Sequence, residues 1–590
     1  MSSLHLGAGV DGGIWHVARA GALRQQDSVL EVERGTNRMT KIGIYAPSFF
    51  PLDEAAFEVL GQALDVSFER RRFDSDRAVD GWIVLGADRK LAAEISRAAR
   101  PCYVVVDEAE LTPVGKSAKI TFANHPNLDR IVRGRIVTAD DAIDAKGLPH
   151  WLDDVTPFAF KDGSPVWAVQ ERPGCRHHYV ALQPPNVNEG EALFIHFSGQ
   201  RFVSLLPLLL FIRSLRQDQG WQPPPMQATF MFDDPNLHWT SYGFIDYREM
   251  VRHAAAGQYH VSVATIPLDA WYVHSPARTI FNDNPERISL LYHGNDHVFR
   301  ELARPPSTEA MRCLLRQAVA RIASMEARTG LAVARVMAPP HGACSETALS
   351  EMARLGFEAV CVSRGSLRHH NPGAAWLATL GLKPCDLLAG LPVIPRFGLT
   401  RNCHNDVLLA ALLHQPIVPI THHQLLADGY DLLDEVARFV NSLGEVSWRN
   451  MQTISRSLYS QRRDGSTLRV RMWSNRITVP LPEWTTQFQV DSPRGNDSAV
   501  ESLYWRNVAT EDRRWNVLTP VEPIVVRAGQ TIEIACGAVD AIRSATCNVG
   551  PRRLAPVARR LLTEGRDRAL PSIHRVVRRR VQSDTIKSDA

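Results

Sequence analysis

The stretch that decides the fold is Thr229-Phe230-Met231-Phe232-Asp233-Asp234, a short apolar run that ends in two adjacent carboxylates. An apolar run of this length is typical of a buried strand in a parallel sheet. Polar residues directly after such a strand reach the C-terminal edge of the sheet, where the active sites of barrel enzymes lie. We therefore expect Asp233 and Asp234 to belong to a functional site.

Two later segments bring histidines to the same edge. One is His293-Gly294-Asn295-Asp296-His297, and the other is Ile420-Thr421-His422-His423, which ends another apolar strand. We expect His293 and His297 to lie on one face of a helical turn, close enough to bind one ion. With Asp234 they make three protein ligands and leave a position for water, as in catalytic sites. Zinc is the expected metal, although cobalt, nickel or manganese would also accept these ligands.

In this order the motifs resemble those of the NodB-like polysaccharide deacetylase family, part of the glycoside hydrolase/deacetylase superfamily. The segments that carry the resemblance are Phe232-Asp233-Asp234, Tyr292-His293 through His297, Met337-Ala338-Pro339-Pro340-His341-Gly342 and Thr421-His422. They lie within residues 218–450, under half of the chain. The resemblance implies a divergent member of the family with a distorted (β/α) barrel.

The resemblance also implies a role for each site residue. Asp234 and both histidines of the second segment would bind the metal, and Asp233 would be the general base. His422 would protonate the leaving amine, with His423 as the alternative because the sequence does not say which ring faces the site. The residues expected to line the substrate pocket are Pro340, His341, Gly342, His238 and Trp239.

The sequence departs from the family pattern at two places near the expected base. Pro235 stands where the family has glycine, and Ala338 stands where the family has the arginine that steadies the base. Arg396, which follows the apolar run 391–395, is the candidate replacement, and Arg364 is the second choice.

The whole chain predicts a multidomain α/β protein, because 590 residues are too many for a single core. Alternating strands and helices predict an open α/β sheet, then a parallel barrel after three consecutive prolines, and short alternating strands predict a small β-sandwich at the end. The predicted parts are an extension (1–38), an N-terminal α/β domain (39–217), the barrel (218–450), the β-sandwich module (451–550) and a basic amphipathic tail (551–590).

The predicted elements can be placed by residue number. In the N-terminal domain we expect strands at 41–46, 82–86, 102–106 and 193–198, and helices at 53–64 and 90–99. In the barrel we expect strands near 227–232, 261–265, 288–292, 333–337, 358–362 and 417–421, with helices such as 308–328 and 428–441 between them.

The cysteine content and the apolar segments indicate the cellular compartment of the protein. The nine cysteines are scattered and form no CxxC pair, which argues against a disulfide framework and against a thiolate zinc site. The N-terminus has no features of a secretory signal. The apolar run 202–212 is too short to cross a bilayer and predicts a buried helix. We therefore expect a cytoplasmic protein.

The net charge of +4 is unevenly distributed. Residues 551–590 hold eleven Lys and Arg against four Asp and Glu, so the other residues together carry −3. The body therefore gives no electrostatic reason to expect a nucleic-acid partner. Apolar stripes beside the arginines of the tail favour peripheral contact with the anionic inner face of the membrane, with a solvated or docked tail as an equal alternative.

Three functions compete. The first is a metal-dependent N-deacetylase acting on an N-acetylated sugar intermediate, nucleotide- or lipid-linked, in cell-surface polysaccharide biosynthesis. The second is an amidohydrolase or deformylase of the same superfamily that cleaves a non-acetyl amide. The third is a non-catalytic carbohydrate-binding or assembly protein with a degenerate site, which the missing loop arginine favours and the retained ligand set opposes.

Overall fold

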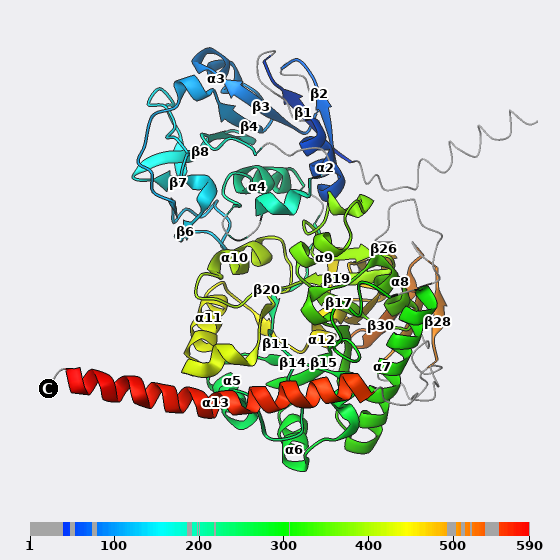
Figure 1. The fold of residues 1–590 in the computed structure, drawn as a ribbon. Helices are drawn as coiled ribbons and strands as arrows, with labels where there is room; N and C mark the ends of the chain where they lie inside the picture. Colours follow the sequence, from blue (N-terminus) through cyan, green and yellow to red (C-terminus); the bar gives the residue numbers. More distant parts are fainter. Residues whose placement is uncertain are drawn as a thin grey trace, which may run out of the picture.

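The structure is a computed structural model, and it describes most of the chain from Met39 to Ser588. The described residues are 39–47, 54–73, 79–185, 191–197, 199, 201–216, 220–305, 307–491, 503–508, 514–519, 522–536 and 554–588, with side chains of the last helix described up to residue 574. The predicted extension 1–38 lies outside them. An N-terminal sheet stacks on one end of a barrel, and the last helix runs along the barrel's other end (Figure 1).

The N-terminal sheet has nine strands in the order β2-β1-β3-β4-β9-β8-β7-β5-β6. Its parallel part is β1 (Thr40–Tyr45), β2 (Val66–Arg70), β3 (Gly81–Ala87), β4 (Cys102–Val106) and β9 (Cys175–Val180). Its antiparallel part is β5 (Lys119–Phe122), β6 (Ile136–Thr138), β7 (Thr156–Lys161) and β8 (Ser164–Arg172). The sheet is mixed, and the sequence had indicated only the parallel part.

Helices cover this sheet. They are α2 (Glu54–Leu64), α3 (Arg89–Ile95) and α4 (Leu206–Leu215), and the apolar run predicted as a buried helix contributes most of α4. Phe211 of α4 packs against Tyr103 and His178 of the sheet. The strand predicted at 193–198 is wrong, because Leu193–Phe197 forms a 3-10 helix.

The second nine-stranded sheet closes into a barrel. Its strands are β11 (Phe230–Asp233), β14 (Val261–Thr265), β15 (Ile288–Tyr292), β16 (Val333–Met337), β17 (Ala359–Val362), β18 (Asp386–Leu388), β19 (Leu391–Pro395), β20 (Phe397–Gly398) and β21 (Pro419–Thr421). Only β18 pairs antiparallel among the described strands of this sheet. Strands β19 and β20 belong to the continuous segment 391–398. Since β19 pairs with β17 and β20 pairs with β21, this segment joins the two ends of the parallel sheet and closes the barrel.

Helices and small pairs of strands surround the barrel. They are α5 (Tyr247–Ala256), α6 (Ser275–Asp283), α7 (Thr308–Thr329), α8 (Glu346–Arg354), α9 (Arg364–His370), α10 (His404–Leu412), α11 (Asp431–Asn441), α12 (Met451–Arg456), β10 (Gln227–Ala228) with β22 (Ser447–Trp448), and β12 (Ser241–Tyr242) with β13 (Ile245–Asp246). The longest, α7, begins where the Ser307 side chain accepts the Ala310 N–H and ends at Gly330, whose φ is +72°.

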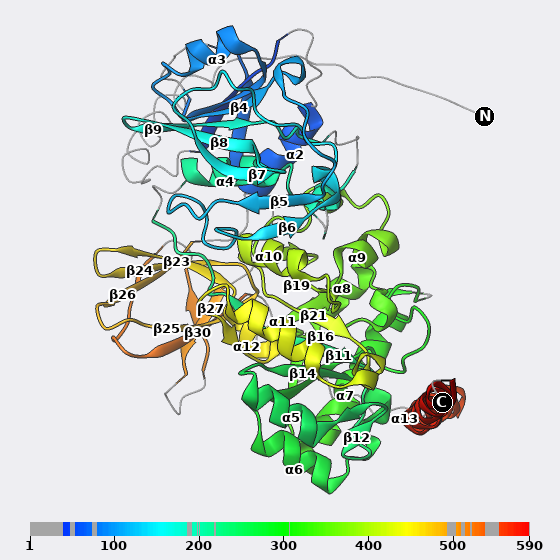
Figure 2. The ribbon, with the colours of Figure 1, turned by 90° about the vertical axis from the view of Figure 1, so that its left-hand side faces the viewer.

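Beyond α12 two four-stranded sheets share one hydrophobic core. One contains β23 (Tyr459–Asp464), β24 (Thr467–Met472), β26 (Gln487–Asp491) and β29 (Ile524–Val525), and the other β25 (Arg476–Pro480), β27 (Leu503–Asn507), β28 (Asn516–Leu518) and β30 (Thr531–Cys536). Leu468, Val470 and Met472 alternate inward along β24, the period of a strand with one buried face. Figure 2 shows these sheets beside the barrel.

The last helix, α13 (Leu554–Ser588), lies against the barrel (Figures 1 and 2). It docks through charged side chains, since Arg560 and Asp567 are buried while Leu554, Leu561, Leu562 and Ile573 are exposed. Among the described residues, no helix combines the length and the apolar character needed to cross a membrane.

Candidate metal centre

The residues of the candidate site lie at the ends of parallel strands, at one edge of the barrel. β11 lies between β14 and β21, and all three run parallel. The carboxylates at the end of β11 therefore meet the histidine after β15 and the histidines after β21 at the same end of the barrel. This is the edge that the sequence predicted for the site.

Asp234, His293 and His297 come together in the geometry of a metal site. One ligand atom from each lies within 4.8 Å of the others. The Nε2 atoms of His293 and His297 are 3.2 and 2.9 Å from Asp234 Oδ1. Burial alone would raise the pKa of Asp234, but the two imidazoles hold this pKa well below its usual value. The site therefore stabilises an anionic oxygen facing two ring nitrogens.

The ligand atoms fit a divalent cation. Asp234 Oδ1 is buried, and no hydrogen bond of good geometry satisfies it among the described residues. The Nδ1–H of His293 donates to the Ala338 carbonyl at 2.9 Å, so its Nε2 keeps a lone pair that faces Asp234. One carboxylate and two neutral imidazoles are ligands that zinc accepts, and three protein ligands leave coordination positions open.

The histidine pair lies on a loop and not on the predicted helical turn. Residues 293–298 come after β15 without helical structure, and Gly294 and His297 have φ values of +62° and +55°. A Cβ atom on Gly294 would meet Glu301 Oε1 at 2.0 Å, so this turn requires glycine. The rings are brought together by the loop and not by helical periodicity.

Glu301 holds this loop, and the sequence motifs did not point to it. Its buried carboxylate accepts the backbone N–H groups of Asn295, Asp296, His297 and Val298 at 2.8, 3.1, 3.2 and 3.3 Å. Burial raises the pKa of Glu301, and the N–H donors oppose this rise. The only sequence signal would have been an acidic residue four positions after the second histidine.

Asp233 is held beside the metal ligands by Arg396. Asp233 is 3% exposed, and Arg396 Nη1 donates to its carboxylate at 3.0 Å. Arg396 also approaches the Pro339 carbonyl at 3.5 Å, so it lies between Asp233 and the proline-containing loop. Arg364, the second choice, donates to Gln415 instead.

The two late histidines face different ways. His422 Nε2 lies 3.9 Å from Asp234 Oδ2, and its side chain is 54% exposed at the mouth of the site. His423 is buried, stacks on Phe244 and lies 3.5 Å from Asp567 of α13. Of the two, His422 therefore has the position from which a proton could reach a substrate.

The Pro-containing loop contributes one side chain to the site. His341, with φ +56°, places its ring 4.9 Å from that of His297, and burial and His297 lower its pKa. Pro340 has no N–H, and the Gly342 N–H already donates to the Pro339 carbonyl at 3.0 Å. Of these loop residues, His341 is the one that borders the metal ligands.

His238 does not line an open pocket, which differs from the prediction. Its Nε2 lies 3.0 Å from the Asp269 carbonyl oxygen, and its Nδ1 lies 3.0 Å from Glu564 of α13. Burial would lower the pKa of His238, but Glu564 raises it above its usual value, in keeping with an acceptor oxygen beside each ring nitrogen. Trp239 is 57% exposed, with Arg568 over its ring.

Helix α13 completes the wall beside the metal ligands, a contact that the sequence did not indicate. Arg560 forms a buried ion pair with Asp269 at 2.6 Å and approaches the Asp234 carbonyl at 3.4 Å. Tyr242 donates to Asp567 at 2.9 Å. The helix thus reaches the backbone of a candidate ligand through a charged side chain.

No protein-family model matches the chain, and no curated protein matches it. Among solved structures, it is similar to a family 4 carbohydrate esterase from Streptomyces lividans in complex with acetate. The identity is 12%, the alignment covers 37% of this chain and 88% of that chain, and the TM-score is 0.23.

Two further solved structures show a comparable similarity. One is a peptidoglycan deacetylase from Bacillus subtilis in a mutant form, with 11% identity, coverage of 40% of this chain and 93% of that chain, and a TM-score of 0.24. The other is a CE4 family pseudoenzyme from Bacillus anthracis, with 11% identity, coverage of 41% and 69%, and a TM-score of 0.25. These structures are of the family that the sequence motifs resemble.

Proposed function

We propose that the chain is a metal-dependent hydrolase that removes the acetyl group from an N-acetylated sugar. The observation that supports this most directly is the convergence of Asp234, His293 and His297 within 4.8 Å, with the Asp233–Arg396 pair and His422 beside them. A divalent metal held there, with zinc as the first choice, would lower the pKa of a water molecule and polarise the amide carbonyl.

The protein's own residues would carry the proton transfers. Asp233 accepts a proton from the attacking water, and the Arg396 guanidinium, 3.0 Å away, holds this buried carboxylate in position. His422, exposed at the mouth, gives a proton to the leaving amine nitrogen. His341 borders the same space and would contact the sugar beside the reacting amide.

The finer identity of the substrate is also a proposal. We favour a nucleotide- or lipid-linked sugar intermediate of cell-surface polysaccharide biosynthesis, handled in the cytoplasm. A non-acetyl amide such as a formyl group would use the same residues, so the two activities differ only in the acid that is released.

Metal analysis with a substrate panel tests the proposal. We expect one divalent ion per purified chain, lost in Asp234→Ala, His293→Ala and His297→Ala, and retained in the exposed controls Asp283→Ala and His369→Ala. The loaded protein should release acetate, and not formate, from N-acylated sugars. Formate release would select the deformylase alternative, and a metal-loaded protein that releases neither acid would select the non-catalytic one. An ion retained in all three variants would contradict the ligand assignment.

Contact with an anionic membrane is a separate proposal that the exposed side of α13 supports. At 100° per residue, Leu554, Leu561, Leu562 and Ile573 lie on the side of the helix away from buried Arg560. Exposed Arg559 and Arg566 flank these apolar side chains, the arrangement of helices that lie in a membrane interface.

Vesicle sedimentation tests this contact. We expect Leu561→Glu combined with Leu562→Glu to lower binding to phosphatidylserine vesicles several-fold, because a carboxylate on this side repels the anionic surface. Val517→Glu, at an exposed position of β28, should leave binding unchanged. Equal binding by the wild type and the Leu561/Leu562 variant would refute membrane contact through α13.

A further inference from the structure

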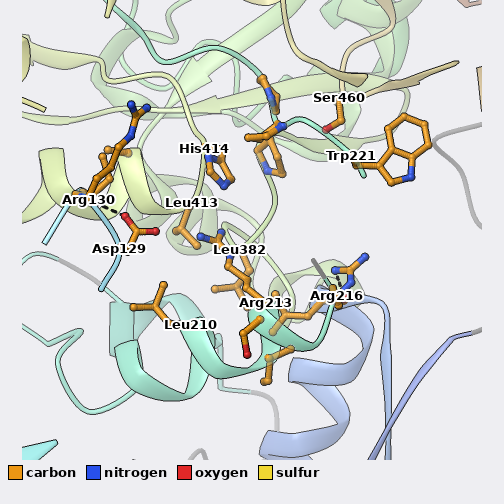
Figure 3. Close-up of a pocket in the computed structure, with 18 of the residues that line it drawn as sticks. Asp129, Arg130, Leu210, Arg213, Arg216, Trp221, Leu382, Leu413, His414 and Ser460 are labelled. Carbon is orange, nitrogen blue, oxygen red and sulfur yellow. Dashed lines mark hydrogen bonds between the residues drawn. The ribbon is translucent and has the colours of Figure 1, made fainter. Parts of the chain in front are cut away.

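A cavity lies at the opposite end of the barrel from the candidate metal centre. It has a volume of about 920 Å³ and is bordered by α4, the proline linker, β24 and the segments that precede barrel strands. His414 precedes β21, and Lys383 precedes β18 and β19, whereas the metal ligands come after their strands. Figure 3 shows Arg213, Arg216, His414 and Trp221 around this space.

Positive charge dominates the lining of the cavity. Three carboxylates line it, from Asp65, Asp129 and Glu445. The cationic side chains that line it are Arg130, Arg133, Arg176, Arg213, Arg216, Lys383 and Arg471. Ion pairs join Arg176 to Glu171 and Arg216 to Asp65. In the part of the chain that the structure describes, Arg130, Arg213 and Arg471 form no ion pair within 4 Å, so no carboxylate pairs with them directly.

The pKa values of two lining groups are lowered, mainly by burial and partly by neighbouring arginines. Burial, with help from Arg216 and against Asp129, lowers the pKa of Arg213 to about 10. Burial and the nearby Arg213 and Arg130 lower the pKa of His414 to about 3. A neutral histidine and mutually repelling arginines around one cavity are typical of a site that concentrates anions.

Trp221 gives the cavity a flat surface. Arg471 lies over its ring at 4.8 Å, and Arg462 lies over it at 5.2 Å. Its indole Nε1 is buried and has no hydrogen-bond acceptor among the described residues. Because arginines already lie over the ring, the feature of Trp221 left for a ligand is this N–H, which can donate to an oxygen of the ligand's ring or sugar.

We propose that this cavity binds an anionic ligand of the nucleoside diphosphate class, with its phosphates near Arg213 and Arg471 and its ring or sugar against Trp221. The volume is within the range of cavities that enclose ligands of this size. Arginine forks match phosphate oxygens in pairs, and two arginines without an ion pair, Arg213 and Arg471, approach the space from α4 and β24. The site does not depend on the metal centre or on the proposed hydrolysis.

Calorimetric titration of the full chain with uridine diphosphate, pyrophosphate and uridine tests the proposal. We expect uridine diphosphate to bind more tightly than pyrophosphate, and uridine to bind weakest. Arg213→Ala and Arg471→Ala should each lower the affinity for uridine diphosphate about tenfold, which is the usual scale for one charge-assisted contact. Arg97→Ala, at an exposed position of the N-terminal domain, should not change it.

The variants separate the two halves of the site. Trp221→Ala should weaken binding of uridine diphosphate and leave that of pyrophosphate unchanged. Should Arg213→Ala fail to fold, because it loses its hydrogen bond to the Leu412 carbonyl, Arg471→Ala carries the charge test. The proposal is overturned if uridine diphosphate does not bind, or if its affinity is the same in the wild type and in Arg471→Ala. Equal binding of pyrophosphate and uridine diphosphate would overturn the role of Trp221.

Discussion

The two nine-stranded sheets of this protein start from the same sequence pattern and differ in what the polar residues at their strand ends do. Both contain buried parallel strands joined by helices. In the barrel, carboxylates, histidines and Arg396 lie just beyond the strand ends and converge at one edge. In the N-terminal sheet, Asp88 after β3 and Asp107 after β4 cap the helices that follow, and His177 and His178 lie buried within β9. Strand alternation therefore predicts the architecture, and the residues after each strand decide where chemistry is possible.

The histidines of the two sheets also differ in the direction in which their pKa is shifted. Burial, with nearby arginines, lowers the pKa of His178 to about 3 and that of His177 to about 4. His293 is equally buried, yet Asp233 and Asp234 raise its pKa above the usual value. A buried histidine is thus a neutral packing group in one sheet and a partner for carboxylates in the other.

The strongest test of this comparison removes the proposed base and leaves the ligands in place. We expect Asp233→Asn to lower kcat by about 10²- to 10⁴-fold, the usual contribution of a general base, with metal content unchanged. Arg396→Lys keeps a positive charge but loses the fork geometry, so a smaller loss of kcat with little change in KM is expected. Steady-state kinetics with metal analysis of each variant would measure both.

The matching change in the N-terminal sheet is His178→Gln, which keeps an acceptor for the Trp167 indole N–H. It should leave kcat and metal content unchanged. Activity lost in His178→Gln, or retained in Asp233→Asn, would break the contrast between the sheets.

A smaller effect is expected in the pH dependence of stability. Folded His178 stays neutral down to pH about 3, whereas the unfolded chain protonates this histidine near pH 6.5. Between these values the unfolded state binds more protons, so the free energy of unfolding falls as the pH is lowered. His178→Gln should remove up to about 1.4 kcal/mol of this fall per pH unit. Urea unfolding at pH 7, 6 and 5 would measure it, and parallel curves for the two proteins would contradict the buried neutral histidine.

The sequence predicted barrel strands well because their ends are marked by a change from apolar to polar residues. Strands expected at 261–265, 288–292 and 333–337 have those bounds in the structure. It predicted Arg396 as the partner of the base because the arginine directly follows an apolar run. The end of a strand can be recognised from the local sequence, and in a parallel sheet the residues at neighbouring strand ends lie close together.

Other features could not be predicted from the sequence alone and became apparent only in the structure. The run at 193–197 is mostly apolar, so periodicity could not separate a strand from a 3-10 helix. The loop at 293–297 depends on positive φ values and on Glu301, which no helical spacing indicates. The docking of α13 was one of the open alternatives, and the sequence did not select it because an amphipathic pattern draws attention to the apolar face, whereas here the charged face is the buried one.

The position of α13 in the chain has a consequence for the order in which the protein assembles. The helix is synthesised after every barrel strand, and its Arg560, Glu564 and Asp567 supply the partners of Asp269, His238 and His423. Until the ribosome has released this segment, a nascent barrel must hold those groups hydrated and apart. The wall beside the metal ligands is therefore the last part of the barrel to mature, so premature termination before residue 554 would leave a barrel with an open side.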